Sequence, residues 1–219
     1  MLLMPLMPLM PPTGRKILMM KVINMSRRRF ILTLSCLASL TGGPLGAANR
    51  ADDDLFWTTL KSPGHVIFLR HAQTDPGIGD PPNFKLGDCS TQRNLSAKGR
   101  ADAQLIGNAF RDRGIPVQDV LSSRWCRCMD TAQLAFGRSK PAHMLDSVFN
   151  DEEKIRKEKA RAVFALVSGR TNPGNLMLVT HAQNIQALTG VSPAPGELVV
   201  VTLKGPNLFN VVARLERVL

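Results

Sequence analysis

Residues 65–72 (HVIFLRHA) decide the fold, because they join a short apolar run to an arginine and a histidine that follow directly. A second stretch of the same kind, residues 176–182 (LMLVTHA), places its histidine 110 residues later. Short, partly β-branched apolar runs bounded by Pro or Gly are typical of buried strands. Open α/β sheets carry their reactive groups just past the carboxyl ends of such strands. The sequence therefore predicts that Arg70, His71 and His181 meet at one edge of a sheet.

A third motif lies between the two histidines. Residues 122–132 (SSRWCRCMDTA) predict the end of a strand, a Ser-Ser turn and the start of a helix. This arrangement directs Arg127 back towards the strand ends, where a planar, permanently charged guanidinium suits bidentate binding of phosphate oxygens. A lone histidine after a strand is more often structural than catalytic. Two histidines in matched settings, together with two arginines, favour a chemical site.

The three motifs resemble those of the histidine phosphatase superfamily, in its phosphoglycerate mutase-like phosphatase branch. The residues that carry the resemblance are Arg70-His71, Ser122-Ser123 with Arg127 and Thr131-Ala132, and Thr180-His181. The resemblance covers roughly residues 65–203. This chain departs from the commonest pattern by having alanine, not glycine, after each histidine, at Ala72 and Ala182. We expect alanine to be tolerated there unless the backbone needs a positive φ.

The resemblance implies an α/β fold, a three-layer sandwich with a central, mostly parallel sheet flanked by helices. It also implies a phosphoric monoester hydrolase in which His71 attacks phosphorus and water then hydrolyses the phosphohistidine. Arg70, Arg127 and a protonated His181 would bind the transferring phosphoryl group. Thr74 is a candidate further hydroxyl donor, with a loop-capping threonine as the alternative. No cofactor is implied, and the sequence has no metal-ligand cluster.

The group that would protonate the leaving oxygen is not evident. Many relatives carry a glutamate shortly after the arginine-bearing helix, whereas residues 145–152 (LDSVFNDE) have serine where it would align. Asp146, Asp151 and Glu152 are the candidate acids, and each has the alternative of a surface or helix-capping carboxylate. The missing acid keeps a second function open, a catalytically silent domain of the same fold that binds phosphorylated ligands.

Charge is concentrated at the N-terminus. The 219 residues carry a formal net charge of +11, but six of the 28 Lys and Arg residues and no Asp or Glu precede Asn49. The remaining 22 basic and 17 acidic residues give a moderate positive balance, which suits a small anionic substrate. No tract interleaves aromatic with basic residues, so a nucleic-acid partner is not expected.

The first 48 residues are not expected to belong to the folded domain. A basic region at 26–31 (SRRRFI), an apolar stretch to Leu40 and small residues at 46–48 are typical of an export signal. The basic region resembles a bacterial twin-arginine motif. An uncleaved membrane anchor is the alternative, but the apolar stretch is shorter than the roughly 20 residues that span a bilayer.

We therefore divide the chain into three parts. Residues 25–48 are interpreted as a twin-arginine-type signal peptide and 49–219 as the histidine phosphatase domain, periplasmic or secreted, with membrane contact only during export. Residues 1–24 are interpreted as a mis-assigned extension ahead of a true start at Met25.

Within the domain, strands that alternate with helices predict a sheet covered on both faces. Residues 49–54 read as a polar leader, and the Gly- and Pro-rich segment 74–94 as a long functional loop. The apolar face of the helix after Ser96 is expected to contain Ala101, Leu105, Ile106, Ala109 and Phe110. Expected helices are 96–113, 125–136, 151–168 and 184–188, and further strands are 119–121, 198–203 and 209–215.

Three cysteines lie in the predicted domain: Cys89, Cys126 and Cys128. In an oxidising compartment Cys89 can pair with either Cys126 or Cys128, and an all-reduced state is a near-equal alternative. A bridge would fix the long loop beside the helix that carries Arg127.

Overall fold

A mixed sheet of six strands forms the centre of the part of the chain that the structure describes. The computed structural model describes residues 45–217. The strand order is β3-β2-β4-β1-β5-β6; β3, β2, β4 and β1 are parallel, and β5 is antiparallel to both its neighbours. The predicted mostly parallel sheet is therefore confirmed. The strands are β1 (Val66–Arg70), β2 (Val117–Ser122), β3 (Lys140–Pro141), β4 (Asn175–Thr180), β5 (Leu198–Gly205) and β6 (Leu208–Leu215).

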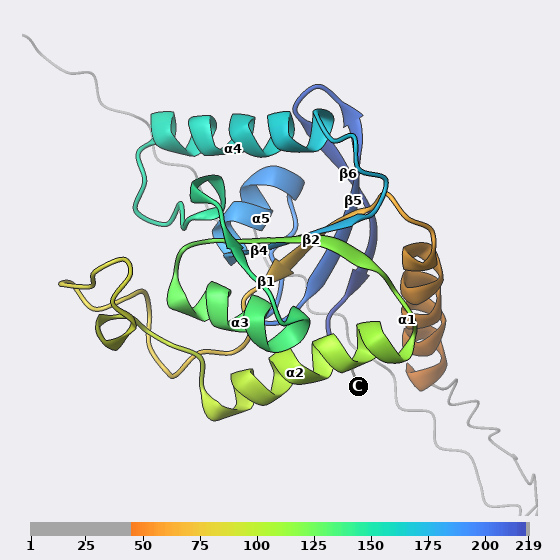
Figure 1. The fold of residues 1–219 in the computed structure, drawn as a ribbon, viewed down its shortest axis with the longest axis horizontal. Helices are drawn as coiled ribbons and strands as arrows, with labels where there is room; N and C mark the ends of the chain where they lie inside the picture. The colour runs from red at the N-terminus through yellow and green to blue at the C-terminus, as the bar shows by residue number, and fades with distance from the viewer. Residues whose placement is uncertain (1–44, 218–219) are drawn as a thin grey trace, which may run out of the picture. The chain divides into compact units, whose positions relative to one another are not determined.

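Helices cover both faces of the sheet, as Figure 1 shows. Side chains of α1, α2 and α3 pack in one hydrophobic cluster with Ile67 and Leu69 of β1. Side chains of α4 and α5 pack in a second cluster with Val66 and Phe68 of the same strand. Because alternate residues enter opposite clusters, β1 is apolar throughout its first four positions. The helices are α1 (Leu45–Lys61), α2 (Ala97–Asp112), α3 (Cys126–Phe136), α4 (Glu153–Ser168) and α5 (Ala182–Thr189), with 3₁₀ turns η1 (Cys89–Thr91) and η2 (His143–Leu145).

The pairing of β1 with β4 brings the two histidine motifs together. The strands are parallel with Arg70 opposite Thr180, and the His71 N–H donates to the Thr180 carbonyl at 3.0 Å. His71 and His181 therefore leave the sheet at the same edge, as predicted. Among the described residues, only Asn207 has a positive φ without being glycine. Ala72 and Ala182 thus need no glycine-only conformation, which confirms that alanine is tolerated at both positions.

Helix α2 buries Ile106, Ala109 and Phe110 as predicted, but it differs from the prediction in the rest of its buried face. Ser96 caps it as expected, accepting from the Gly99 N–H at 3.1 Å. Leu105, however, is 50% exposed and Ala101 is also exposed, whereas Ala103 and Gly107 are buried. The cause is close backbone contact with α3, because a Cβ on Gly107 would lie 1.9 Å from the Ala135 carbonyl oxygen. Helix packing here is set by a glycine, which a search for large apolar residues does not detect.

Residues 49–54 form part of helix α1, so the expected polar leader is wrong. The later half of this helix buries Phe56, Trp57 and Leu60. Trp57 packs edge-on against Phe110 of α2 at 5.3 Å between ring centroids. These aromatic contacts anchor the helix to the rest of the domain.

The predicted extension 1–24 lies outside the described residues, as does all of the predicted signal 25–48 except its last four positions. In the described part of the chain, no helix combines the length and the apolar character needed to cross a bilayer.

Candidate active site

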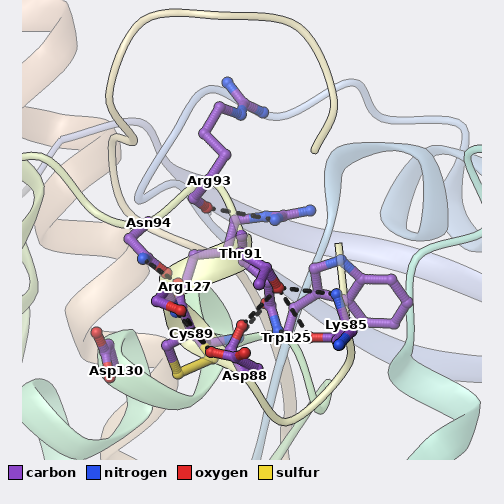
Figure 2. The surroundings of a disulfide bond; sticks show 12 residues. Lys85, Asp88, Cys89, Thr91, Arg93, Asn94, Trp125, Arg127 and Asp130 are labelled. Carbon is purple, nitrogen blue, oxygen red and sulfur yellow. Dashed lines mark hydrogen bonds between the residues drawn. A yellow bond between two sulfur atoms is a disulfide. The ribbon is translucent and has the colours of Figure 1, made fainter. Parts of the chain in front are cut away.

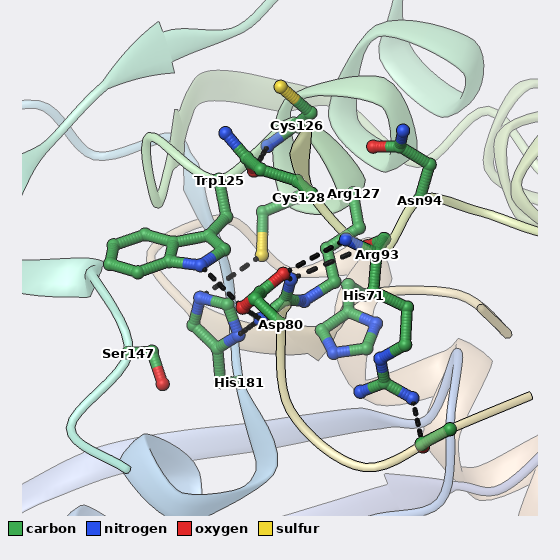
Figure 3. Close-up of polar contacts among 12 residues, drawn as sticks. His71, Asp80, Arg93, Asn94, Trp125, Cys126, Arg127, Cys128, Ser147 and His181 are labelled. Carbon is green, nitrogen blue, oxygen red and sulfur yellow. Dashed lines mark hydrogen bonds and ion pairs between the residues drawn. The ribbon is translucent and has the colours of Figure 1, made fainter. Parts of the chain in front are cut away.

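A cavity of about 530 Å³ opens at the carboxyl ends of β1 and β4. Four residues predicted to form the site line it: Arg70, His71, Arg127 and His181. The rings of His71 and His181 lie 5.4 Å apart between centroids, in an edge-to-face arrangement. The structure therefore brings together residues that are far apart in the sequence, and Figure 3 shows the two imidazoles beside Arg127.

His71 presents one free ring nitrogen to this cavity. Its Nδ1 lies 2.9 Å from the Ala72 carbonyl oxygen, and because a carbonyl can only accept, Nδ1 carries the proton. Nε2 consequently holds a lone pair. Burial, with contributions from Arg127, Arg70 and Arg93, lowers the pKa of His71 to about 3, although the bond to Ala72 acts in the opposite direction. The ring is thus neutral throughout the physiological pH range, with the Nε2 lone pair available.

His181 is held by a chain of hydrogen bonds. Its Nδ1 lies 3.4 Å from an Arg127 terminal nitrogen, which can only donate, so Nε2 carries the proton and donates to Ser123 Oγ at 2.9 Å. Burial, together with the nearby His71 and Arg127, lowers the pKa of His181 well below its usual value. The ring is therefore neutral in this structure, in contrast to the protonated form expected from the sequence. Without a bound anion, the positive charge of the pocket belongs to arginines.

Three arginines, not two, line the cavity. Arg93 comes from the long loop and joins Arg70 and Arg127. Each of the three has a buried Nε–H without a partner, and these account for three of the five such polar atoms in the described part of the chain. Burial and then the charge of Arg93 lower the pKa of Arg70, while burial and then the charge of Arg127 lower that of Arg93. Mutual repulsion and unpaired donors at one place indicate a binding site for an anion.

Arg93 could not be predicted as a site residue from the sequence, because it lies in no motif with the other site residues. The only signal was its position near the end of the long loop that was expected to form part of the site. Arg93 donates from a terminal nitrogen to the Gly77 carbonyl at 2.7 Å, so it also closes the loop on itself.

Asp80 is a second residue that the sequence did not identify. Its carboxylate accepts from both terminal nitrogens of Arg127, at 2.7 and 3.2 Å, and from the indole N–H of Trp125 at 3.0 Å. The Arg93 backbone N–H donates to it at 3.0 Å. Burial acts to raise the pKa of Asp80, but the bonds from Arg127, Arg93 and Trp125 outweigh it and lower the pKa. Asp80 therefore stays ionised inside the cavity (Figure 3).

A disulfide fixes the loop beside the arginine helix. Cys89 is bonded to Cys126 (Figure 2), which settles the open choice of partner. Cys128 remains a free, buried thiol. Cys126 begins α3 and directly precedes Arg127. Burial raises the pKa of Cys128 to about 12, so a thiolate nucleophile is disfavoured at this position.

Serine in place of both Cys89 and Cys126 is expected to lower the free energy of unfolding by about 2–4 kcal/mol, the usual contribution of a bridge that closes a loop of this length. Thermal unfolding measures this directly. Dithiothreitol should produce a similar loss in the wild type and none in the double variant. An equal effect of the reductant on both proteins would mean that the bridge does not stabilise the fold.

The predicted acids occupy three different settings. Asp146 is 2% exposed, accepts from Arg124 Nε at 2.8 Å and does not line the cavity. Asp151 lines the cavity, but Lys159 Nζ donates to it at 2.6 Å. Glu152 is exposed and precedes α4 as its N-cap, away from the cavity lining. Thr74 also lies away from the lining, in a backbone bridge with Leu95 at the base of the loop.

Asp146 instead contacts the residues that hold His181. Ser123 Oγ lies 3.4 Å from Asp146 Oδ1 and 2.9 Å from His181 Nε2. The Asp146 carbonyl accepts from the Asn184 side chain at 2.9 Å, which connects it to helix α5. Asp146 is therefore a positioning residue for the second histidine. Among the described side chains, no group of three or more His, Cys, Asp or Glu residues is placed to bind a metal ion.

The lowered pKa of His71 predicts how stability depends on pH. The pKa in the folded state, about 3, lies below the ordinary value of 6.5 that applies to the unfolded chain. Between these two values the unfolded chain binds more protons, so stability is full above about pH 6.5 and is lost as the pH falls towards 3.

The Tm of the wild type should therefore drop between about pH 7.5 and 5, and His71→Ala should reduce that drop by a few degrees, about 3 °C. Protonation of Asp80, whose pKa is lowered from 3.8, falls below this range and does not interfere. An identical pH dependence of Tm in the two proteins would refute the assignment of a neutral, proton-resisting His71.

The sheet edge, with its two imidazoles and three arginines, has a composition that suits a phosphate-like anion beside a neutral histidine. Residues 66–152 match the model of the histidine phosphatase superfamily (branch 1). This range includes His71, Asp80, Arg93 and Arg127, whereas His181 lies beyond it. The likeness to the histidine phosphatase superfamily (branch 1) is thus shown for residues 66–152, which are 87 of the 219 residues.

Two curated relatives match part of the chain. The serine/threonine-protein phosphatase Pgam5, mitochondrial, of Drosophila virilis is 28% identical over 100 residues, which are 43% of this chain and 32% of that protein. The Pgam5 protein of Drosophila willistoni is 28% identical over 86 residues, which are 39% of this chain and 26% of that protein. The chain thus matches about a third or less of the length of these relatives.

Solved structures share the fold at low sequence identity. The alpha-ribazole phosphatase from Shigella flexneri has a TM-score of 0.51 and 15% identity, covering 68% of this chain and 95% of that chain. The mycobacterial glucosyl-3-phosphoglycerate phosphatase in complex with VO₃ has a TM-score of 0.50 and 15% identity, covering 68% of this chain and 97% of that chain. These likenesses agree with the predicted phosphoglycerate mutase-like α/β fold.

Proposed function

We propose that this chain is a phosphatase that hydrolyses phosphate monoesters through a phosphohistidine on His71. The single observation that carries the proposal is the unprotonated Nε2 of His71 in a cavity with three arginines whose Nε–H groups are unpaired. A phosphate dianion would satisfy those donors and lie next to the lone pair. The His71 nitrogen and the phosphorus atom would then be held next to each other in a geometry suited to attack, without a cofactor.

The reaction would take two steps. In the first, His71 Nε2 forms a bond to phosphorus while the bond from phosphorus to the ester oxygen breaks, and the leaving oxygen takes up a proton. In the second, water attacks the phosphohistidine, releases phosphate and restores the neutral imidazole. Arg70, Arg93 and Arg127 would stabilise the charge on the equatorial oxygens. The bound phosphate would also favour protonation of His181, which is neutral without it.

The names of the relatives support a phosphatase and point to no single substrate. They comprise a serine/threonine-protein phosphatase, an alpha-ribazole phosphatase and a glucosyl-3-phosphoglycerate phosphatase. The cavity of about 530 Å³ is of the size that binds small molecules. We therefore propose a small phosphorylated substrate as the partner, without nucleic acid.

Hydrolysis of p-nitrophenyl phosphate by the full chain tests this proposal. The ester has a good leaving group, so it reports on the nucleophile and the arginine pocket even where acid assistance is weak. Turnover between about pH 4 and 8 is the expected result, because His71 is unprotonated down to about pH 3. Binding of inorganic phosphate without any turnover would favour the alternative, a catalytically silent domain that binds phosphorylated ligands.

We also propose that the protein is exported by the twin-arginine-type signal at residues 25–48 and acts in the periplasm or outside the cell. The order of basic, apolar and small residues supports this. A disulfide in the active-site loop is consistent with an oxidising compartment. Fractionation of bacteria that express the full chain should recover a shortened protein outside the cytoplasm. Recovery in the cytoplasm alone, with the leader intact, would refute export.

A further inference from the structure

Asp80 is placed where a substrate phosphate would need to bind. Both terminal nitrogens of Arg127 donate to its carboxylate, in the two-pronged geometry that a guanidinium also uses for phosphate oxygens. The pair is buried, with side-chain exposures of 5% for Arg127 and 9% for Asp80. A phosphoryl group that engages Arg127 must therefore displace Asp80 or share the guanidinium with it. In both cases Asp80 stays within the first layer of groups around the substrate.

The backbone around Asp80 allows this displacement. Gly77 and Gly79 adopt φ values of +138° and +69°, which are strained for other residues, and Ile78 between them is 93% exposed. The side-chain bonds that hold this tip are the Arg93 bond to the Gly77 carbonyl and the bonds of Asp80 itself. Asp80 can move by a rotation within this tip while the disulfide keeps the base of the loop in place.

The other carboxylates of the described chain are less suitable as proton donors. Only Asp80 and Asp151 line the cavity. Asp151 is held by Lys159, at 2.6 Å, in an ion pair that does not involve any of the three arginines. Asp146 is bound to Arg124 outside the cavity. Of the two cavity carboxylates, Asp80 is the one bonded to Arg127, which would bind the transferring phosphoryl group.

We propose that Asp80 is the catalytic residue that protonates the leaving oxygen of the substrate, a proposal that rests on the phosphatase function above. As phosphate takes over the Arg127 donors, the carboxylate loses two of its partners and faces a dianion. Both changes favour the protonated carboxyl. That proton passes to the ester oxygen as its bond to phosphorus breaks. The carboxylate then accepts a proton from the water that attacks the phosphohistidine, which restores the proton that it gave to the leaving oxygen.

The test compares Asp80→Asn with the wild type on two esters that differ in leaving group, p-nitrophenyl phosphate and benzyl phosphate. A poor leaving group needs the acid and a good one does not. Asp80→Asn should therefore lose about 10²–10⁴-fold in kcat/KM on benzyl phosphate and much less, below about tenfold, on p-nitrophenyl phosphate. Asp151→Asn, the matched change at the other cavity carboxylate, should leave the ratio between the two substrates unchanged.

Two further measurements distinguish a proton-donating role of Asp80 from a purely structural one. Asp80→Glu retains a carboxyl and should recover part of the benzyl phosphate activity, which a purely structural role would not predict. Inorganic phosphate should also inhibit Asp80→Asn more strongly, by about tenfold, because the competing carboxylate is gone. Thermal unfolding of each variant shows whether it is folded.

Three results would overturn the proposal. Equal losses on the two substrates in Asp80→Asn would mean that Asp80 only holds Arg127. A selective loss in Asp151→Asn would assign the acid to that residue. A folded wild type that hydrolyses neither ester would end the phosphatase proposal itself, and the assignment of Asp80 with it.

Discussion

His71→Ala is expected to lower the kcat for p-nitrophenyl phosphate by on the order of 10⁴-fold or more, because it removes the atom that forms the covalent intermediate. No other described side chain at the cavity combines an unprotonated nitrogen lone pair with this position among the three arginines. His181 cannot replace it, since its Nδ1 faces Arg127 and its Nε2 carries a proton directed at Ser123. Steady-state kinetics on the purified full chain measure the loss.

His143→Ala is the matched control for this change. His143 is an exposed histidine of η2 that does not line the cavity, so its loss should leave kcat within about twofold. Thermal unfolding and inhibition by inorganic phosphate should show that His71→Ala is folded and still binds an anion. Near wild-type turnover in His71→Ala would place the nucleophile on another residue.

Arg127→Lys is expected to reduce kcat/KM by about 10²–10³-fold, the second largest effect. Lysine keeps the charge but offers a single ammonium, so it cannot bind two oxygens in a plane or maintain the contact with His181 at the same time. The change also breaks the two-pronged bond to Asp80. Thermal unfolding separates this stability effect from the loss of catalysis.

Arg100→Lys provides the comparison on the surface. Arg100 is exposed and pairs with the partly exposed Asp130 at 3.1 Å, and neither residue lines the cavity. Its replacement should leave kcat/KM unchanged within error. Similar kinetics for Arg127→Lys and the wild type would show that the guanidinium does not contact the phosphoryl group in the transition state.

The sheet and the meeting of His71 with His181 could be predicted from the sequence because they depend on local patterns. Residues 66–69 and 176–179 are continuous apolar runs, since both faces of their strands are covered by helices. A histidine one residue beyond the end of each run, after Arg70 or Thr180, must then leave the sheet at its edge. The helix cap at Ser96 could also be predicted, because capping depends on a hydroxyl next to the first turn of the helix.

The features that could not be predicted depend on contacts between distant segments. Helix α1 owes its position to Trp57 and Phe110, which are far apart in the sequence. The buried face of α2 follows from the close approach of Gly107 to Ala135. Each of these contacts is visible only after the chain has folded.

Asp80 and Arg93 could not be predicted as site residues for the same reason. Both lie in the long loop, whose Gly and Pro content indicates a turn-rich segment but not the direction of any side chain. Their places are set by the Cys89–Cys126 bond and by the hydrogen bonds of Asp80 to Arg127 and Trp125. The sequence thus indicates His71, Arg127 and His181 and leaves Asp80 and Arg93 to the tertiary structure.

Rapid quenching of the full chain during turnover of radiolabelled p-nitrophenyl phosphate tests the central claim most directly. Phosphohistidine is labile in acid and stable in base, so the label can be followed through alkaline workup and peptide mapping. We expect a label on the peptide that contains His71, formed at least as fast as the steady-state turnover and absent in His71→Ala. Turnover without a labelled protein, or a label on any residue other than His71, would contradict it.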